Sequence, residues 1–308
     1  MIRVHKRAFS VLAFSCVIAL ALVASGILPG HYAVGQAGRR AHSANEGASV
    51  LNVIATRDDR SSEPVTGKQV ALYDNGVEQS IKSFSIDPSP SRLVLLVDNS
   101  LTIRADVEKL EEATREFAYE IYEGDKLLIV GYDDQAEIVA DWTDDAKQIE
   151  TSLKSFRKKG DPHLFDALSA VAEEALRPLS GQKRVIVVIS DGLDRGSKTK
   201  FTEALNALQD MDIAVYAVQA PDRTRGAMRR DQPKPVQVID QLASGTGGRV
   251  FPIDEARAAA KTICDELRKN RYLLSYAASG VPFGDARRIL VLADSGISVR
   301  SKSAQPPD

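Results

Sequence analysis

The chain has 308 residues, of which 44% are hydrophobic and 27% charged, with 40 Lys and Arg against 42 Asp and Glu. This is the composition of a globular protein, and it excludes collagen-like, coiled-coil and disordered chains. The formal charge of −2 leaves no basic excess for binding a phosphate backbone, so we expect no nucleic acid partner.

Residues 1–37 predict a signal peptide or an N-terminal membrane anchor. Arg3, Lys6 and Arg7 precede an uncharged run over residues 8–28, which is the order of a secretory signal. Cleavage after Ala37 would change the formal charge from −2 to −5. The run also has about the ~20 residues that span a bilayer, so an uncleaved anchor is the alternative. In both cases we expect the rest of the chain to be exported, as a periplasmic, secreted or membrane-anchored protein.

The sequence has two cysteines, and Cys16 lies in this N-terminal segment. Cleavage would leave Cys264 alone, so no disulfide within the chain is expected even in an oxidising compartment. Cys264 stands in a helical pattern, which favours a small buried apolar residue over a reactive thiol.

Residues 38–90 predict a polar tether followed by an accessory β element. The segments 50–55, 69–73 and 81–86 alternate apolar and polar residues, as half-buried strands do. Asp74-Asn75-Gly76 predicts a turn between two of them, and Asp87-Pro88-Ser89-Pro90 predicts a linker.

Residues 91–279 predict a domain in which strands and amphipathic helices alternate. Strands are expected at 93–97, 126–132, 136–142, 185–189 and 213–218, and helices at 107–122, 164–176, 200–209 and 254–269. Continuous β-branched runs are typical of strands covered on both faces. We therefore expect an α/β fold with a mainly parallel sheet and ligands at the carboxyl ends of its strands. Residues 280–308 predict C-terminal strands and a disordered tail.

Oxygen-bearing side chains follow two of these strands. Asp98, Ser100 and Thr102 occupy alternate positions after the first strand, and Asp191 follows the most apolar one. Oxygen-only ligands suit a hard divalent cation and lack the nitrogen or sulfur that zinc prefers. Because both strands end at one edge of the sheet, we expect the two loops to meet there. The alternative is that Asp98 and Ser100 cap the next helix and Asp191 holds a turn.

Val97-Asp98-Asn99-Ser100-Leu101-Thr102 together with Ile189-Ser190-Asp191-Gly192 resembles the von Willebrand factor type A (VWA) domain. More narrowly, the sequence segments 72–79, 164–168, 242–251 and 272–276 resemble segments of an exported bacterial VWFA-related family typified by Acidobacteria. The resemblance covers roughly residues 50–300. It implies a Rossmann-like sheet and a metal-ion-dependent adhesion site.

The resemblance also implies roles for the four residues. Asp98 and Asp191 would hold a metal through water, while Ser100 and Thr102 would coordinate it through their hydroxyls. The metal would be Mg²⁺, with Mn²⁺ or Ca²⁺ as alternatives, and its open position would take an acidic side chain from an unidentified partner protein. The expected function is thus metal-assisted protein binding or adhesion.

One part of the family pattern is missing here. The family's Gly-Gly-Thr reads Gly160-Asp161-Pro162 in this chain, so Pro162 offers no hydroxyl at the Thr position. Asp161 could substitute through water, and His163 and Asp194 are candidates for a partner-binding rim. The alternative is a metal-independent structural or scaffold module.

We expect no enzymatic activity. The chain has no Gly-x-Ser-x-Gly elbow, P-loop or dinucleotide-binding glycine motif. A hydrolase would need His163 beside Asp161 or Asp98 as a general base. A basic cluster after the strand at 213–218 is interpreted as a solvated loop and contains Arg223, Arg225, Arg229 and Arg230.

Overall fold

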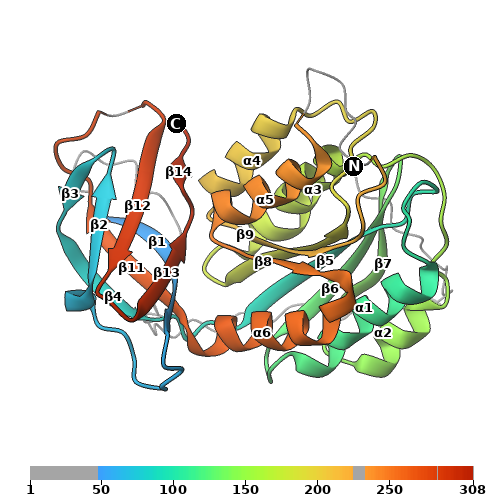
Figure 1. The fold of residues 1–308 in the computed structure, drawn as a ribbon, viewed down its shortest axis with the longest axis horizontal. Coiled ribbons are helices and arrows are strands. Elements are labelled where there is room, and N and C mark those ends of the chain that lie inside the picture. Colours follow the sequence, from blue (N-terminus) through green and yellow to red (C-terminus); the bar gives the residue numbers. More distant parts are fainter. Residues whose placement is uncertain (1–47, 225–232, 283, 308) are drawn as a thin grey trace, which may run out of the picture.

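The computed structural model describes residues 48–224, 233–282 and 284–307. They form an α/β unit and a β-sandwich that lie side by side, joined along the bottom of the view by a long helix (Figure 1). The predicted signal or anchor at residues 1–37 and the start of the tether lie outside the described residues.

The α/β unit is built on one six-stranded sheet, in the order β10-β9-β8-β5-β6-β7. All neighbouring pairs are parallel except β6 and β7, which are antiparallel. The predicted α/β fold with a mainly parallel sheet is therefore confirmed. The strands are β5 (Ser91–Asp98), β6 (Lys126–Tyr132), β7 (Ala136–Thr143), β8 (Lys183–Ser190), β9 (Ala214–Gln219) and β10 (Val250–Pro252).

Helices cover both faces of this sheet. Leu93, Leu95 and Val97 of β5 face one core, against α1 (Val107–Glu120), α2 (Ala146–Leu153) and α6 (Ala256–Lys269). Val94 and Leu96 face the other. That second layer consists of α3 (Leu164–Ala170), α4 (Phe201–Asp210) and α5 (Pro235–Thr246). Successive residues of a strand point to opposite faces, so two buried faces require the continuous apolar run seen in the sequence.

Short helical segments complete this unit. The π-helical turn η2 (Val171–Leu176) and the 3-10 turn η3 (Arg177–Leu179) extend α3, and the 3-10 turn η4 (Ile253–Glu255) precedes α6.

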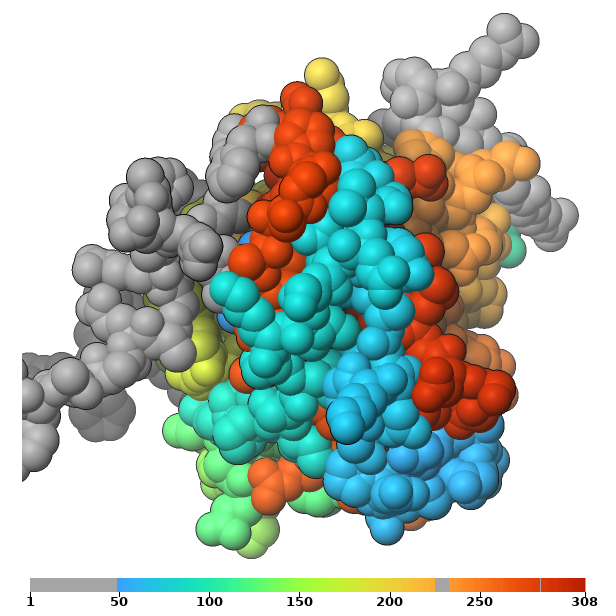
Figure 2. Space-filling view, turned by 90° about the vertical axis from the view of Figure 1, so that its left-hand side faces the viewer, coloured from blue at the N-terminus to red at the C-terminus, as the bar shows by residue number. Residues whose placement is uncertain are grey.

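The β-sandwich combines strands from both ends of the described chain, as the blue-to-cyan and red surfaces in Figure 2 show. One sheet has the order β13-β1-β11-β4 and the other β14-β12-β2-β3. Their buried faces form a third core around Val53, Leu72 and Leu274. The strands are β1 (Ala48–Arg57), β2 (Val70–Asp74), β3 (Val77–Gln79), β4 (Ile81–Ile86), β11 (Arg271–Ala277), β12 (Arg287–Ala293), β13 (Ile297–Ser301) and β14 (Ala304–Gln305), with the 3-10 turn η1 (Gly67–Gln69) before β2.

Two expected boundaries are wrong. Residues 272–276 fall inside the range 91–279 that we predicted for the α/β domain, but they belong to β11, which pairs with β1 and β4 of the sandwich. The C-terminal tail is ordered rather than disordered, since β14 pairs with β12. Its polar groups are bonded: Lys302 Nζ, in a residue 6% exposed, donates to the carbonyl oxygen of Gln209 at 2.8 Å and to Gln305 Oε1 at 2.7 Å. These contacts pair polar groups of a segment whose composition alone is typical of disorder.

Charged side chains join the two units. Glu266 at the end of α6 accepts hydrogen bonds from Arg300 Nη2 at 2.6 Å, Arg249 Nη1 at 3.0 Å and the Tyr216 hydroxyl at 3.1 Å. Asn52 Nδ2 donates to Asp212 Oδ2 at 2.6 Å. The interface is thus fixed by directional bonds. Within the described ranges, the structure contains no helix with the length and apolar character needed to cross a membrane.

Candidate functional site

The carboxyl ends of β5 and β8 carry the two predicted acids. Asp98 is the last residue of β5, and Asp191 directly follows β8. The two strands are neighbours at the middle of the sheet, where the chain order reverses direction. Open α/β sheets bind their ligands at this switch point. Asp98 and Asp191 both have 0% exposure, so two acidic side chains are buried at this edge of the sheet.

Local hydrogen bonds orient Asp98. Its Oδ1 accepts from the Ser100 backbone N–H at 3.0 Å and the Ser100 hydroxyl at 2.6 Å, which folds the loop back on itself. Its Oδ2 accepts from the Ser190 hydroxyl at 3.1 Å, and Ser190 Oγ in turn accepts from the Tyr132 hydroxyl at 2.8 Å. Three neighbouring strands therefore fix this one carboxylate.

A glycine lets the loop after β8 approach helix α5. Asp191 Oδ1 accepts from the Leu193 N–H at 3.0 Å, and Gly192 between them has φ +84°. A Cβ at Gly192 would lie 2.4 Å from the carbonyl oxygen of Pro235 at the start of α5. Only glycine fits this conformation and this approach without strain.

The guanidinium of Arg223 lies in the centre of the predicted site. Its Nη2 donates to Asp98 Oδ2 at 2.7 Å and to Asp191 Oδ1 at 2.6 Å, and its Nε donates to Asp191 Oδ2. Its Nη1 donates to Ser100 Oγ at 3.2 Å and to Thr102 Oγ1. The structure thus brings Asp98, Ser100, Thr102 and Asp191 together around one organic cation. We call these four residues and Arg223 the Arg223 cluster.

The interpretation of Arg223 as part of a solvated loop is wrong. Its side chain is 5% exposed and pairs with two fully buried acids. The sequence did carry a signal, because Arg223 follows β9, whose carboxyl end lies at the same sheet edge as those of β5 and β8. Arg225, Arg229 and Arg230 lie outside the described residues.

Burial and ion pairing have opposite effects on the pKa values of Asp98 and Arg223. Desolvation raises the pKa of Asp98 although the Arg223 guanidinium beside it acts to lower that pKa. Burial also acts to lower the pKa of Arg223, but the carboxylates of Asp191 and Asp98 outweigh it and raise that pKa. Asp98 therefore depends on a nearby cation to remain ionised.

The residues fit a hard metal ion by type but not in this arrangement. Two carboxylates and two hydroxyls are the oxygen donors such an ion prefers. The guanidinium already bonds all four groups, so a metal cannot share them with Arg223. In the described part of the chain, no group of three or more His, Cys, Asp and Glu side chains is arranged to hold a metal ion.

In the loop that contains Asp161 and Pro162, both residues bond groups outside the Arg223 cluster. Pro162 is buried and its carbonyl accepts from the Arg195 N–H at 2.6 Å. The Asp161 side chain is 57% exposed and reaches Arg195 at 3.9 Å, while its backbone N–H donates to Asp134 Oδ1 at 2.8 Å. Among the contacts of the described residues, Asp161 has no direct bond to the Arg223 cluster, and its role as a substitute ligand through water stays a prediction.

The two suggested rim residues differ in exposure. Asp194 is 5% exposed and accepts from the Phe165 N–H at 3.1 Å and the Ser197 hydroxyl at 2.5 Å, so its placement on the rim is wrong. It ties the third loop to the start of α3 instead. The His163 side chain is 24% exposed, with Nε2 3.9 Å from Asp134 Oδ1. That neighbour is neither Asp161 nor Asp98, the acids that the hydrolase hypothesis requires.

A family model described as the von Willebrand factor type A domain matches residues 93–194. The chain contains a VWA domain. The match runs from β5 to the loop after β8, so it includes Asp98 and Asp191 but not Arg223. The narrower resemblance to the exported bacterial family stays a prediction.

Several solved structures are similar to this chain. An aerotolerance-related membrane protein from Bacteroides fragilis and the conserved hypothetical protein BatB from Bacteroides thetaiotaomicron are 20% and 19% identical, each with a TM-score of 0.46. Each match covers 58% of this chain, and 99% and 98% of those chains. A von Willebrand factor type A protein from Catenulispora acidiphila is 9% identical with a TM-score of 0.49, covering 86% of this chain and 75% of its own. No curated protein matches the chain.

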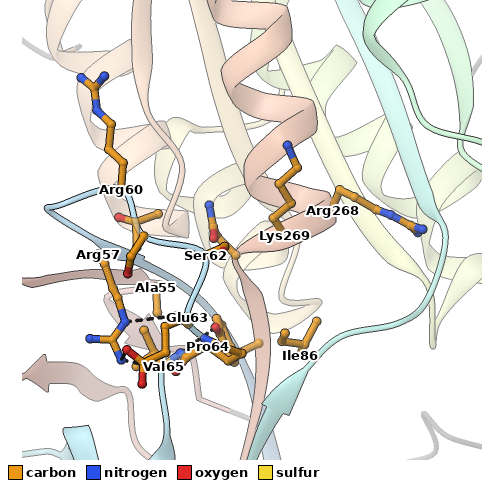
Figure 3. A pocket seen from close by; sticks show the side chains of 14 residues that line it. Ala55, Arg57, Arg60, Ser62, Glu63, Pro64, Val65, Ile86, Arg268 and Lys269 are labelled. Atoms are coloured by element: carbon orange, nitrogen blue, oxygen red, sulfur yellow. Dashed lines mark hydrogen bonds and ion pairs between the residues drawn. The ribbon is translucent and has the colours of Figure 1, made fainter.

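A separate hollow of about 610 Å³ lies between the sandwich and the end of α6 (Figure 3). Two of its basic residues already bond other groups. Arg57 Nε donates to the carbonyl oxygen of Glu63 at 3.0 Å, and Lys269 Nζ donates to Asp265 Oδ1 at 2.7 Å. These bonds give Arg57 and Lys269 structural roles near the junction of the two units.

Proposed function

We propose that this chain is an exported protein that binds another protein through the sheet edge around the Arg223 cluster. The observation that carries the proposal is a buried ion cluster at the switch point of a VWA sheet. Burying charge costs free energy, and a buried ion pair seldom repays that cost in stability. Perturbed charged groups gathered at the ligand-binding edge of a sheet therefore favour a functional role over a structural one.

The surface above the cluster has an apolar anchor for a partner. Leu101, between Ser100 and Thr102, is 65% exposed. Its backbone N–H donates to the carbonyl oxygen of Gly160, and this bond holds the loop after β5 against the loop that contains Gly160. Exposed apolar residues beside polar groups are typical of protein-binding surfaces. Export is supported by the basic and then apolar order of residues 1–37.

Capture from a cell-envelope extract tests this proposal. The bait is the full chain, compared with Leu101→Asp and with the matched control Leu290→Asp, which makes the same change at a 52% exposed leucine on β12 of the sandwich. We expect Leu101→Asp to lose a protein that the wild type and Leu290→Asp both retain. Equal capture by all three chains would contradict binding at this edge.

Metal-assisted binding is the second candidate, favoured by the oxygen-only chemistry of the four side chains. When bound, Mg²⁺ or Mn²⁺ would supply a Lewis-acidic position for an acidic side chain of the partner. Asp98, Ser100, Thr102 and Asp191 would hold it. In that case a chelator should abolish the capture that depends on Leu101, whereas a metal-independent scaffold would keep it.

A further inference from the structure

Every hydrogen-bond donor of the Arg223 side chain is in use. A guanidinium has five N–H donors. They meet Asp98 Oδ2, both oxygens of Asp191, Ser100 Oγ and Thr102 Oγ1. No donor remains for an acidic side chain of a partner. In this arrangement the cluster is closed both to a metal and to a carboxylate.

The backbone around Arg223 is also held in place. The Arg223 N–H donates to Asp191 Oδ2 at 3.3 Å, and its carbonyl accepts from Arg104 Nη2 at 3.1 Å. Just upstream, the Ala220 N–H donates to the carbonyl oxygen of Ser190 at 3.0 Å. The guanidinium is therefore delivered by a fixed backbone at the end of β9 and not only by a long side chain that happens to reach the site.

Charge makes Arg223 and a metal mutually exclusive. The two carboxylates and Arg223 leave one negative charge in the cluster, which a divalent ion in place of Arg223 would neutralise. Both cations use the same oxygens, and two cations at that separation repel each other strongly in a site shielded from water. Loss of Arg223 would leave two buried carboxylates without a counter-ion, a state that favours uptake of another cation.

We propose that Arg223 is the resident cation of this site and competes directly with divalent metal ions. The site binds Mg²⁺ or Mn²⁺ only when the Arg223 side chain is withdrawn. Arg223 thereby stands in for the metal in the closed state. This inference deepens the metal-assisted form of the proposed function and rests on it for any partner effect, but metal binding itself can be measured without a partner.

Mn²⁺ titration of the full chain tests the inference, with free Mn²⁺ followed by electron paramagnetic resonance. We expect saturable binding to Arg223→Gln, at least about tenfold tighter than to the wild type, because the competing charge is gone. Arg223→Gln combined with Asp98→Asn should lose this binding. Arg195→Gln is the matched control, since it removes an exposed arginine near the site and should leave the wild-type behaviour unchanged.

Circular dichroism shows whether each variant is folded. If Arg223→Gln unfolds, Arg223→Met carries the test, because methionine keeps an unbranched side chain, removes the competing charge and should admit Mn²⁺ more readily than the wild type. Mn²⁺ binding to the wild type within about threefold of the folded Arg223 variants would overturn the proposal. So would folded Arg223 variants that bind no Mn²⁺. Either result leaves the capture experiment with Leu101→Asp to be judged separately.

Discussion

Arg223 donates hydrogen bonds to both carboxylate oxygens of Asp191, so the loop after β9 is fastened to the loop after β8. This two-point pairing is the geometry in which an arginine best recognises a carboxylate. The same guanidinium reaches Asp98 at the end of β5. One side chain thus connects the ends of three adjacent strands of the sheet.

Removing Arg223 should destabilise the protein more than neutralising Asp98, the acid that it contacts at the end of β5. Arg223→Ala leaves two buried acids unpaired and should lower the free energy of unfolding by about 3–5 kcal/mol. Asp98→Asn leaves Arg223 paired with Asp191 but weakens the hydrogen bonds that Asp98 accepts from Ser100, Ser190 and Arg223, so its cost should be smaller, about 1.5–3 kcal/mol. Urea unfolding of both variants measures the contrast. Equal losses would show that Asp98 matters as much as the cation.

Glu266 should be a strong point of the junction between the two units. Glu266→Gln weakens three hydrogen bonds, two of them from arginines, and should lower the free energy of unfolding by about 1.5–3 kcal/mol. The control is Asp265→Asn in the same helix, which loses ion pairs whose carboxylate is 30% exposed, and it should cost less than about 1 kcal/mol. A control that costs as much as Glu266→Gln would argue against a special role for the buried acid.

Asp166 should make stability depend on acid pH. Burial acts to raise its pKa, but the backbone N–H groups of Thr199 and Lys198 donate to the carboxylate and lower its pKa overall. A lowered pKa in the folded state gives stability above the unfolded pKa of about 3.9, and this stability is lost as the pH falls through the folded value. The stability gap between wild type and Asp166→Asn should therefore be full near pH 6 and shrink below about pH 4. Unfolding curves across this range would refute the expectation if the gap stayed constant.

The thiol of Cys264 should be inert in the folded chain. Cys264 lies in α6 and is 2% exposed. Burial raises the pKa of its thiol, so little thiolate forms. In a Cys16→Ser background, a colorimetric thiol reagent should react with Cys264 only after denaturation. A cysteine introduced at Ser295, in the exposed turn before β13, should react at once and shows that the reagent is active. Rapid labelling of native Cys264 would indicate local opening of α6.

The α/β sheet was predictable because its signals are local. Apolar runs such as 185–189 must be buried on both faces, and this requirement alone predicts a strand between helices. The two acidic loops were predictable for the same reason, since each directly follows such a run. The sandwich was only partly predictable, because β1 pairs with β11 more than 200 positions later. No local pattern specifies which distant strand completes a sheet.

Arg223 was misjudged because its surroundings in the sequence differ from its surroundings in space. A basic residue near prolines and glycines is usually solvated, and composition favours that interpretation. Its burial depends on two acids that stand 32 and 125 positions away along the chain. The position after β9 identifies the sheet edge to which Arg223 belongs, but only the folded structure identifies its partners.

The sandwich also constrains when the protein can finish folding. The α/β unit is formed by a nearly continuous stretch, so its strands and helices can associate as the chain emerges from the ribosome. The strand β1 must wait for β11 and β13, the latter ending at Ser301, before its sheet is complete. Until then the apolar faces of β1 and β2 have no partner, and they would need shielding during synthesis or passage across a membrane.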